Sequence, residues 1–263
     1  MTTIDRRSFI ALGGSAAALA TFSLAGCGGG GETSFPAVST TTGGPLAAGK
    51  DGSKFQAVGN DHSLLVTTPA GTQKRVGGLG KAAGKLNFPA GVAILNGLAY
   101  VVEAGNHRVQ VFDGAGNSVG MIGEGQLFHP AGIATSTTEI FVSDTRNARI
   151  VAFSPSGQVT RTLGVGILSA PRGLTVVEGG VIVADPGLHK VLKLSFNGGV
   201  DSTYRSDLFL PYDVATDGDA IYIAEVSGKE LKVADANGCS IATIPLQAAP
   251  YSVAFRNGSL YVS

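Results

Sequence analysis

The sequence predicts an all-β fold, a β-propeller built from four-stranded blades, and three observations support this. A block of about 40 residues recurs along the chain, and each block reads as four short strands. No helical pattern of about 10–15 residues separates the blocks, which disfavours a parallel α/β sheet. Glycine supplies 39 of the 263 residues and charged residues only 14%, against a usual ~25% charged. A chain rich in turns and poor in helices is expected.

Three markers share the period of the repeat. The proline that opens each block recurs at steps of 41, 41, 40 and 39 residues, and the acidic residue that closes the second strand at 41, 41 and 40. The glycine in the turn after the third strand recurs at 45, 41, 41 and 40. The prolines are Pro89, Pro130, Pro171, Pro211 and Pro250, the acids are Glu103, Asp144, Asp185 and Glu225, and the glycines are Gly71, Gly116, Gly157, Gly198 and Gly238.

The best-formed block, residues 88–117, shows what each strand contributes. The first strand follows Pro-x-Gly at 91–94, and the second, 98–102, is apolar and aromatic. The third, 108–112, alternates, which predicts one buried and one solvated face. Turns such as DGAGN then place Asp before a glycine able to take positive φ, closing a hairpin onto the fourth strand. Closing the blades into a ring removes exposed sheet edges.

The number of blades follows from how the chain ends are counted. First strands, third strands and turn glycines each number five, whereas second strands number six if residues 55–58 and 260–263 are both included. We expect five complete blade equivalents, with six the alternative. In the five-blade arrangement, residues 250–263 supply the inner strands of a blade whose outer strands are residues 63–77, which locks the two chain ends together.

The N-terminal segment predicts export and a lipid anchor. Arg6 and Arg7 precede an apolar run, residues 9–24, that is too short and too diluted to span a bilayer. Arg6, Arg7 and Phe9 resemble the twin-arginine export motif, although Asp5 stands where that motif usually has Ser or Thr. Leu-Ala-Gly-Cys, ending at Cys27, resembles the bacterial lipobox, whose cysteine receives a diacylglycerol thioether and an N-acyl chain.

Three segments are therefore expected. They are a signal peptide at 1–26, a lipidated Cys27 with a flexible Gly/Ser/Thr linker at 27–50, and the propeller at 51–263. We expect a protein exported and anchored to the cell envelope. Gly28 favours the periplasmic face of an outer membrane where the cell has one, by resemblance to bacterial lipoprotein sorting. The other cysteine, Cys239, lies beside Gly238 in a predicted hairpin turn, and we expect an ordinary surface residue.

The blocks also resemble the NHL repeat, whose pattern is roughly P-x-G-[IV]-A, a [YF]-V-x-D strand end and N-x-R-[IV]-x-x-F. The ranges 89–93, 106–109, 130–134 and 147–150 match it well. Later copies depart, since Asp213 and Ser252 replace the Pro-x-Gly glycine and Glu230 replaces the arginine. The resemblance implies the fold over residues 54–263. It says little about function, because one fold hosts many activities.

Most candidate chemistry has a structural explanation. His62, His107 and His189 share one repeat position, so we interpret them as loop residues rather than metal ligands. The recurring acids are expected to accept backbone N–H groups of the turn that follows, or to pair with Arg108, Arg149 or Lys190. We assign no catalytic residue, no metal ligand and no cofactor beyond the lipid on Cys27. Lys and Arg number 19, as do Asp and Glu, so nothing favours nucleic acid as a partner.

Variation on one face of the ring suggests a binding patch instead. The residue after each marker proline is Ala90, Ala131, Arg172, Tyr212 or Tyr251, so two adjacent blades present methyl groups and three present a cation and two phenols. With His129 and Asp213 nearby, this side of the channel mouth is the candidate site for a protein or small-molecule partner. The preferred hypothesis is a membrane-tethered binding scaffold. The alternative is an enzyme, a metal-dependent lyase or lactonase-like hydrolase of the NHL-like propeller kind.

Overall fold

The repeated block folds as an antiparallel four-stranded sheet, in the strand order that its pattern predicts. In the block that starts at residue 88, the sheet is β6 (Pro89–Leu95), β7 (Leu98–Glu103), β8 (Arg108–Phe112) and β9 (Ser118–Ile122), each paired with the next. The glycines that close the hairpins between third and fourth strands, Gly71, Gly116, Gly157, Gly198 and Gly238, all have positive φ, between 79° and 92°. The turn chemistry read from the sequence is confirmed.

The computed structural model describes residues 36–40, 44–256 and 258–263. Within these ranges, four more sheets repeat the order of β6–β9. They are β2–β5 (Leu46–Ala48, Lys54–Val58, Ser63–Thr67, Gln73–Gly77), β10–β13 (Ile133–Thr135, Ile140–Asp144, Arg149–Phe153, Val159–Leu163), β14–β17 (Leu174–Val177, Gly180–Asp185, Lys190–Ser195, Val200–Arg205) and β18–β21 (Pro211–Thr216, Ala220–Glu225, Glu230–Asp235, Ser240–Pro245).

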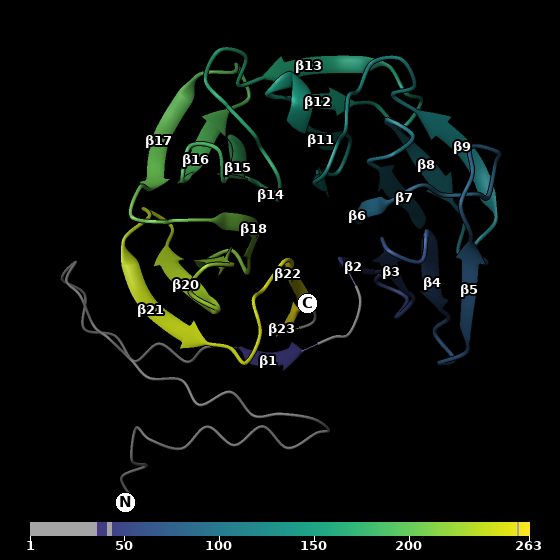
Figure 1. Cartoon of the computed structure of the whole chain (residues 1–263), viewed down its shortest axis with the longest axis horizontal. Coiled ribbons are helices and arrows are strands. Elements are labelled where there is room, and N and C mark those ends of the chain that lie inside the picture. Colours follow the sequence, from purple (N-terminus) through teal and green to yellow (C-terminus); the bar gives the residue numbers. More distant parts are fainter. Residues whose placement is uncertain (1–35, 41–43, 257) are drawn as a thin grey trace, which may run out of the picture.

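Six sheets in the described part of the chain surround a central channel as blades of a propeller (Figure 1). We number them by chain order, from blade 1 (β2–β5) to blade 5 (β18–β21). Blade 6 combines β22 (Val253–Arg256), β23 (Ser259–Val262) and β1 (Ala37–Thr40). The predicted all-β propeller is confirmed, and the alternative count of six blades is correct. A four-stranded sheet forms in five of them.

The two ends of the described chain meet in blade 6, by a different pairing from the one expected. Strand β1 runs parallel to β23, with Ala37 opposite Ser259 and Thr40 opposite Val262. The five-blade arrangement required residues 63–77 to complete this blade, and they do not. They form β4 and β5 of blade 1, next to β3.

Two strands lie inside the segment expected to be a flexible linker. Strand β1 covers residues 37–40 and β2 covers residues 46–48, and Gln56 of β3 pairs with Leu46 of β2. The propeller therefore begins before residue 51. Arg6, Arg7, Phe9 and Cys27 lie outside the described residues. Within the described ranges, no helix is long and apolar enough to cross a membrane.

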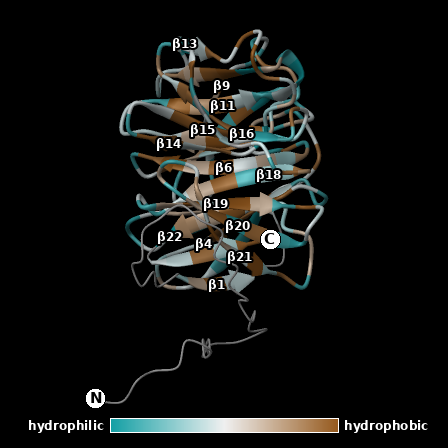
Figure 2. Cartoon of the chain, turned by 90° about the vertical axis from the view of Figure 1, so that its left-hand side faces the viewer, coloured by the Kyte–Doolittle hydropathy of each residue, from teal (hydrophilic) through white to brown (hydrophobic). Residues whose placement is uncertain are grey.

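The apolar core lies between blades rather than at the centre of the ring. Separate buried clusters join blades 1 and 2, 2 and 3, 3 and 4, 4 and 5, and 5 and 6. In the side view, hydrophobic residues dominate the strands, and hydrophilic ones gather in the loops of the two faces (Figure 2). This geometry explains why one prediction was wrong. The third strand of blade 2 alternates in sequence, yet all of 108–112 is buried, because neighbouring blades cover both of its faces.

The polar residues of that strand are buried because an acid accepts their hydrogen bonds. Glu103, at the end of β7, accepts from Arg108 Nε at 2.7 Å and from Gln110 Nε2 at 3.2 Å. It also accepts from the backbone N–H of Asn87 at 3.0 Å. Asn87 belongs to what we call a lead-in loop, the segment just before the inner strand of a blade.

The same arrangement recurs in the next three blades. We call it the latch: a carboxylate at the end of the second strand accepts backbone N–H groups of the lead-in loop of its own blade. Asp144 accepts from Phe128 N at 2.7 Å, and Asp185 accepts from Ser169 N at 2.8 Å and Ala170 N at 2.9 Å. Glu225 accepts from the N–H groups of Phe209 and Leu210 at 3.1 and 2.8 Å. A structural role for the recurring acids was expected. Most of their backbone donors, however, come from the lead-in loop before the strand, and only Leu188 N, on Asp185, lies in the turn that follows.

Replacing Glu103 by glutamine should destabilise the fold strongly. The substitution leaves the guanidinium of Arg108 buried without its counter-charge, and breaking a buried ion pair costs about 3–5 kcal/mol. The matched control is Asp61→Asn, because Asp61 pairs with Arg75 at 2.7 Å while the two side chains are 58% and 52% exposed. That change should cost less than about 1 kcal/mol. Urea unfolding of both variants measures the difference, and equal losses would contradict the latch.

Candidate functional site

The lead-in loops of all six blades converge at one end of the central channel, which we call the mouth. Each loop presents one residue at an equivalent position, recognised by backbone bonds to the second strand such as Ala131 N to Ser143 O at 3.1 Å and Arg172 N to Ala184 O at 2.9 Å. In blade 1 the equivalent bond runs from Gly44 N to Ala57 O at 3.0 Å. The complete ring of mouth residues is Gly44, Ala90, Ala131, Arg172, Tyr212 and Tyr251.

This ring divides into two halves. Blades 1 to 3 present a glycine and two alanines, and blades 4 to 6 present an arginine and two tyrosines. The sequence had shown five of the six positions. Gly44 was missed because it lies in the segment expected to be linker and lacks the marker proline before it. With it, the small half is complete and contiguous.

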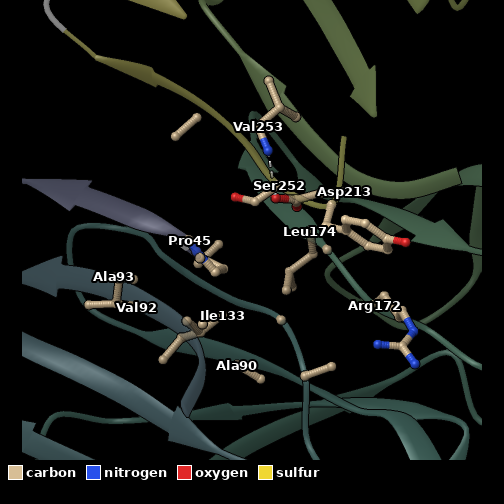
Figure 3. Close-up of a pocket in the computed structure, with 18 of the residues that line it drawn as sticks. Pro45, Ala90, Val92, Ala93, Ile133, Arg172, Leu174, Asp213, Ser252 and Val253 are labelled. Carbon is tan, nitrogen blue, oxygen red and sulfur yellow. Dashed lines mark hydrogen bonds between the residues drawn. The ribbon is translucent and has the colours of Figure 1, made fainter. Parts of the chain in front are cut away.

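The mouth opens into a cavity of about 870 Å³, lined by the inner strands of all six blades. Figure 3 shows Arg172, Asp213 and Ala90 around the same open space, with Val92, Ile133 and Leu174 also lining it. The walls are mixed, because beside these apolar residues they include Thr135, Thr175, Thr216 and the cation Arg256. A cavity of this size is typical of small-ligand sites in proteins.

The three large mouth residues pack against one another. The guanidinium carbon of Arg172 lies 4.3 Å from the ring centroid of Tyr212, a cation–π contact. Tyr212 in turn meets Tyr251 edge-to-face, with ring centroids 5.3 Å apart and planes at 90°. Tyr251 remains 56% exposed. The structure thus brings Arg172, Tyr212 and Tyr251 together as one cluster, which we call the mouth cluster.

Positive charge gathers next to this cluster. Within the described residues, neither Arg172 nor Arg146 forms an ion pair. His129 lines the cavity, and desolvation lowers the pKa of its imidazole, with the charge of Arg146 and, less strongly, those of His107 and Arg172 lowering it further. Desolvation is the larger cause of this shift, and the smaller part that comes from Arg146, His107 and Arg172 reflects the cations near the mouth. Arg146, in the short 3₁₀ turn after β11, was not picked out from the sequence.

Asp213 lies in the channel wall and bridges blades 5 and 6. Its carboxylate accepts from Val214 N at 2.9 Å and from Val253 N, on β22, at 3.0 Å (Figure 3). Burial raises the pKa of Asp213 to about 7, although the backbone N–H donors and the Ser252 side chain act in the opposite direction. Its oxygens are therefore engaged at the blade junction and not by Arg172.

Blades 2 to 4 have glycine at the position that Asp213 occupies in blade 5. A Cβ on Gly132 would lie 2.1 Å from the carbonyl oxygen of Arg172, and one on Gly91 would lie 2.9 Å from that of Ala131. The next blade passes too close for a side chain. Blade 5 accommodates aspartate because the adjoining blade offers the Val253 N–H to its carboxylate.

The histidines at one repeat position join neighbouring blades. His62, His107 and His189 all have positive φ, between 50° and 59°, as do Ala148 and Lys229 at the same position. His62 Nδ1 accepts from Phe88 N and His107 Nδ1 from His129 N, both at 3.0 Å, and His189 Nδ1 contacts the carbonyl oxygen of Phe209. Each ring also packs on a phenylalanine of the next lead-in loop. Their role as loop residues is visible in these contacts.

Among the described residues, no three or more His, Cys, Asp or Glu side chains gather as a group that could hold a metal ion. Cys239 follows Gly238 in the β20–β21 turn, is partly buried, and donates its backbone N–H to Asp235 Oδ1 at 2.8 Å.

A family profile described as the NHL repeat matches residues 86–112, the best-formed block. The protein is a six-bladed β-propeller in which one block matches the NHL repeat. A search of curated protein sequences found no match to this chain. Among solved structures, virginiamycin B lyase from Staphylococcus aureus is similar, with a TM-score of 0.66, 16% identity, and coverage of 83% of this chain and 75% of that one.

Two other similar structures differ in what they contain. The catalytically inactive S. aureus virginiamycin B lyase with Quinupristin has the same TM-score, 0.66, with 16% identity over 83% of this chain and 75% of its own. A nidogen/laminin complex has a TM-score of 0.71 and 18% identity, with 83% of each chain covered. At such low identity these similarities establish the shared fold alone.

The stability of the protein should depend on the protonation of Asp213. Its folded-state pKa of about 7 lies above the unfolded value of ~3.9, so the folded state retains a proton that the unfolded state releases. Stability from this group is therefore present below about pH 4 and is lost as the pH rises to about 7, by an amount on the order of a few kcal/mol.

Asp213→Asn removes this titration. The amide of asparagine has one acceptor oxygen where the carboxylate has two, so the variant loses a hydrogen bond, and the cost of that loss does not vary with pH. The wild type should therefore lose stability relative to the variant between about pH 4 and pH 7.5, measured by urea unfolding at intervals across that range. If the difference in free energy of unfolding between the two proteins stays constant with pH, burial does not raise the pKa of Asp213 as described.

Proposed function

We propose that the protein is a binding module that holds a protein or small-molecule partner at the channel mouth. The observation that carries the proposal is the division of the mouth ring. Repeat construction explains residues that recur in every blade, but it does not account for Arg172, Tyr212 and Tyr251 standing opposite Gly44, Ala90 and Ala131. Large aromatic and arginine side chains are the residues that contribute most to binding at protein surfaces.

The surroundings of the mouth cluster support this proposal. Phe88 is 51%, Phe128 47% and Phe209 69% exposed, and all three belong to lead-in loops on the same face as Tyr251. Exposed aromatic side chains grouped on one face are typical of interaction sites. The similarity to a nidogen/laminin complex adds that a chain of this fold occurs within a protein complex.

Combined substitution of Arg172, Tyr212 and Tyr251 by alanine should abolish partner capture. The three side chains form one contact surface, so removing them should reduce captured partner at least about tenfold, as expected when hot-spot residues are truncated. The measurement is quantitative mass spectrometry of proteins and ligands retained from envelope extracts by purified wild type and variant.

The matched control lies at the other end of the channel. Thr137, Glu178 and Asp219 are exposed residues of the turns that join first and second strands, and all three become alanine. This control should capture the same partners as the wild type. If the mouth variant also captures them undiminished, the mouth is not the binding surface.

We further propose that the propeller is exported and tethered to the cell envelope through lipid on Cys27. The support is the sequence of the N-terminal segment, with Arg6, Arg7 and Phe9 in the export signal and Leu-Ala-Gly before Cys27. Gly28 favours the periplasmic face of an outer membrane. In this arrangement residues 28–35 connect the anchor to β1.

Cys27→Ser should remove the lipid and release the protein from the membrane fraction. Cells grown with labelled palmitate should incorporate label into the wild type and none into the variant, because serine lacks the thiol that forms the thioether. Cys239→Ser is the matched control and should remain labelled. Label retained by Cys27→Ser would show that the anchor is elsewhere or absent.

The second candidate function is a metal-dependent lyase or lactonase-like hydrolase. It is favoured by the fold shared with virginiamycin B lyase and by two titratable groups at the mouth, His129 and Asp213. Metal analysis of the purified protein separates the two candidates. The binding-module proposal predicts no stoichiometric divalent metal, and one zinc or calcium ion per chain would favour the enzyme.

A further inference from the structure

The guanidinium of Arg172 is oriented but uncompensated. Tyr212 covers one of its faces at 4.3 Å, which restricts its rotation, and no described residue pairs with it as a counter-ion. The nearest acid in the channel wall, Asp213, directs its oxygens to Val214 N and Val253 N instead. A stacked guanidinium keeps its in-plane N–H fork available for an anion.

Space for such an anion exists on the opposite side of the mouth. Gly44, Ala90 and Ala131 place no long side chain at the ring positions of that half, and the cavity continues past Val92, Ile133 and Leu174 (Figure 3). A ligand that reaches Arg172 from this side would place the rest of its body beside Ala90, Ala131 and Ile133. It therefore needs one charged end and an apolar face toward these residues.

We propose that Arg172 binds the carboxylate of a small organic acid whose apolar body lies in the channel beside Ala90 and Ala131. The proposal deepens the binding function given above and rests on it. A singly charged carboxylate matches the fork of one guanidinium with two parallel hydrogen bonds. A dianionic phosphate would bring a second negative charge that the fork of one guanidinium leaves without a partner, and burying an unpaired charge is costly.

The neighbouring charges favour an anion and indicate which residue holds it. Arg146 raises the positive potential at the mouth, since its charge contributes to the lowered pKa of His129. Arg146 does not line the cavity and has no aromatic ring stacked on it. It should attract anions to the mouth without holding them, which makes it the matched control for Arg172.

The test is isothermal titration of the full chain with sodium benzoate at pH 7.5. Benzoate has a carboxylate and a compact apolar ring. Arg172→Gln should weaken benzoate binding at least about tenfold, the loss expected for a charge-assisted hydrogen-bonded pair. Arg146→Gln should change benzoate affinity less than about threefold, because Arg146 is exposed and its charge is screened by solvent and salt. Benzamide, the neutral analogue, should bind the wild type at least about tenfold more weakly than benzoate.

Several outcomes would overturn the proposal. They are no saturable benzoate binding to the wild type, equal binding by Arg172→Gln, or inorganic phosphate displacing benzoate stoichiometrically. Thermal unfolding checks that the variants are folded. Should Arg172→Gln be unstable, Arg172→Lys keeps the charge without the fork and should still weaken binding. If the mouth triple variant loses partner capture but the wild type does not bind benzoate, only this inference is refuted. If the wild type binds benzoate but the triple variant still captures partners, only the capture surface is refuted.

Discussion

The rest of the structure depends on buried carboxylates that accept the backbone N–H groups of the lead-in loops. These acids, Glu103, Asp144, Asp185 and Glu225, are almost completely inaccessible to solvent. Each one holds the lead-in loop of its own blade in place at the channel mouth. Burying a carboxylate is costly unless its hydrogen bonds are satisfied. The backbone N–H groups of the lead-in loop supply part of these bonds, so the loop cannot move without leaving a buried carboxylate with fewer donors. The position of each mouth residue follows from this constraint.

Because the backbone of the lead-in loop is held in the same way in successive blades, the side chains at the mouth can be compared directly. Because the same latch positions every lead-in loop in blades 2 to 5, the difference between Ala90 and Tyr212 is a difference of side chain and not of backbone. Arg172, Tyr212 and Tyr251 then pack into one cluster across three blades. The opposite half, with Gly44, Ala90 and Ala131, leaves room beside it. The proposed binding site is the combination of the two halves.

Much of this could be predicted from the sequence, and the failures have physical reasons. Strand order, turn glycines and the mouth positions of blades 2 to 6 follow from local chemistry repeated at a fixed period. The blade count did not, because blade 1 has Val58 where blades 2 to 5 have the acid, and β1 joins β23 by a parallel pairing that leaves no pattern in sequence. The burial of Gln110 was missed because alternation predicts a solvated face, whereas in a ring both faces of a sheet are covered. Asp213 was placed in the patch, but its bond to Val253 requires knowledge of the neighbouring blade.

The central claim is that a ligand at the channel mouth contacts the mouth cluster on blades 4 to 6. It can be tested by NMR of protein labelled on its tyrosine rings, since the chain has only six tyrosines. Addition of sodium benzoate should shift the ring signals of Tyr212 and Tyr251, which lie at the mouth. The signals of Tyr100 and Tyr222, buried between blades, should stay in place. Shifts of the buried rings with no change at Tyr212 and Tyr251 would contradict the claim.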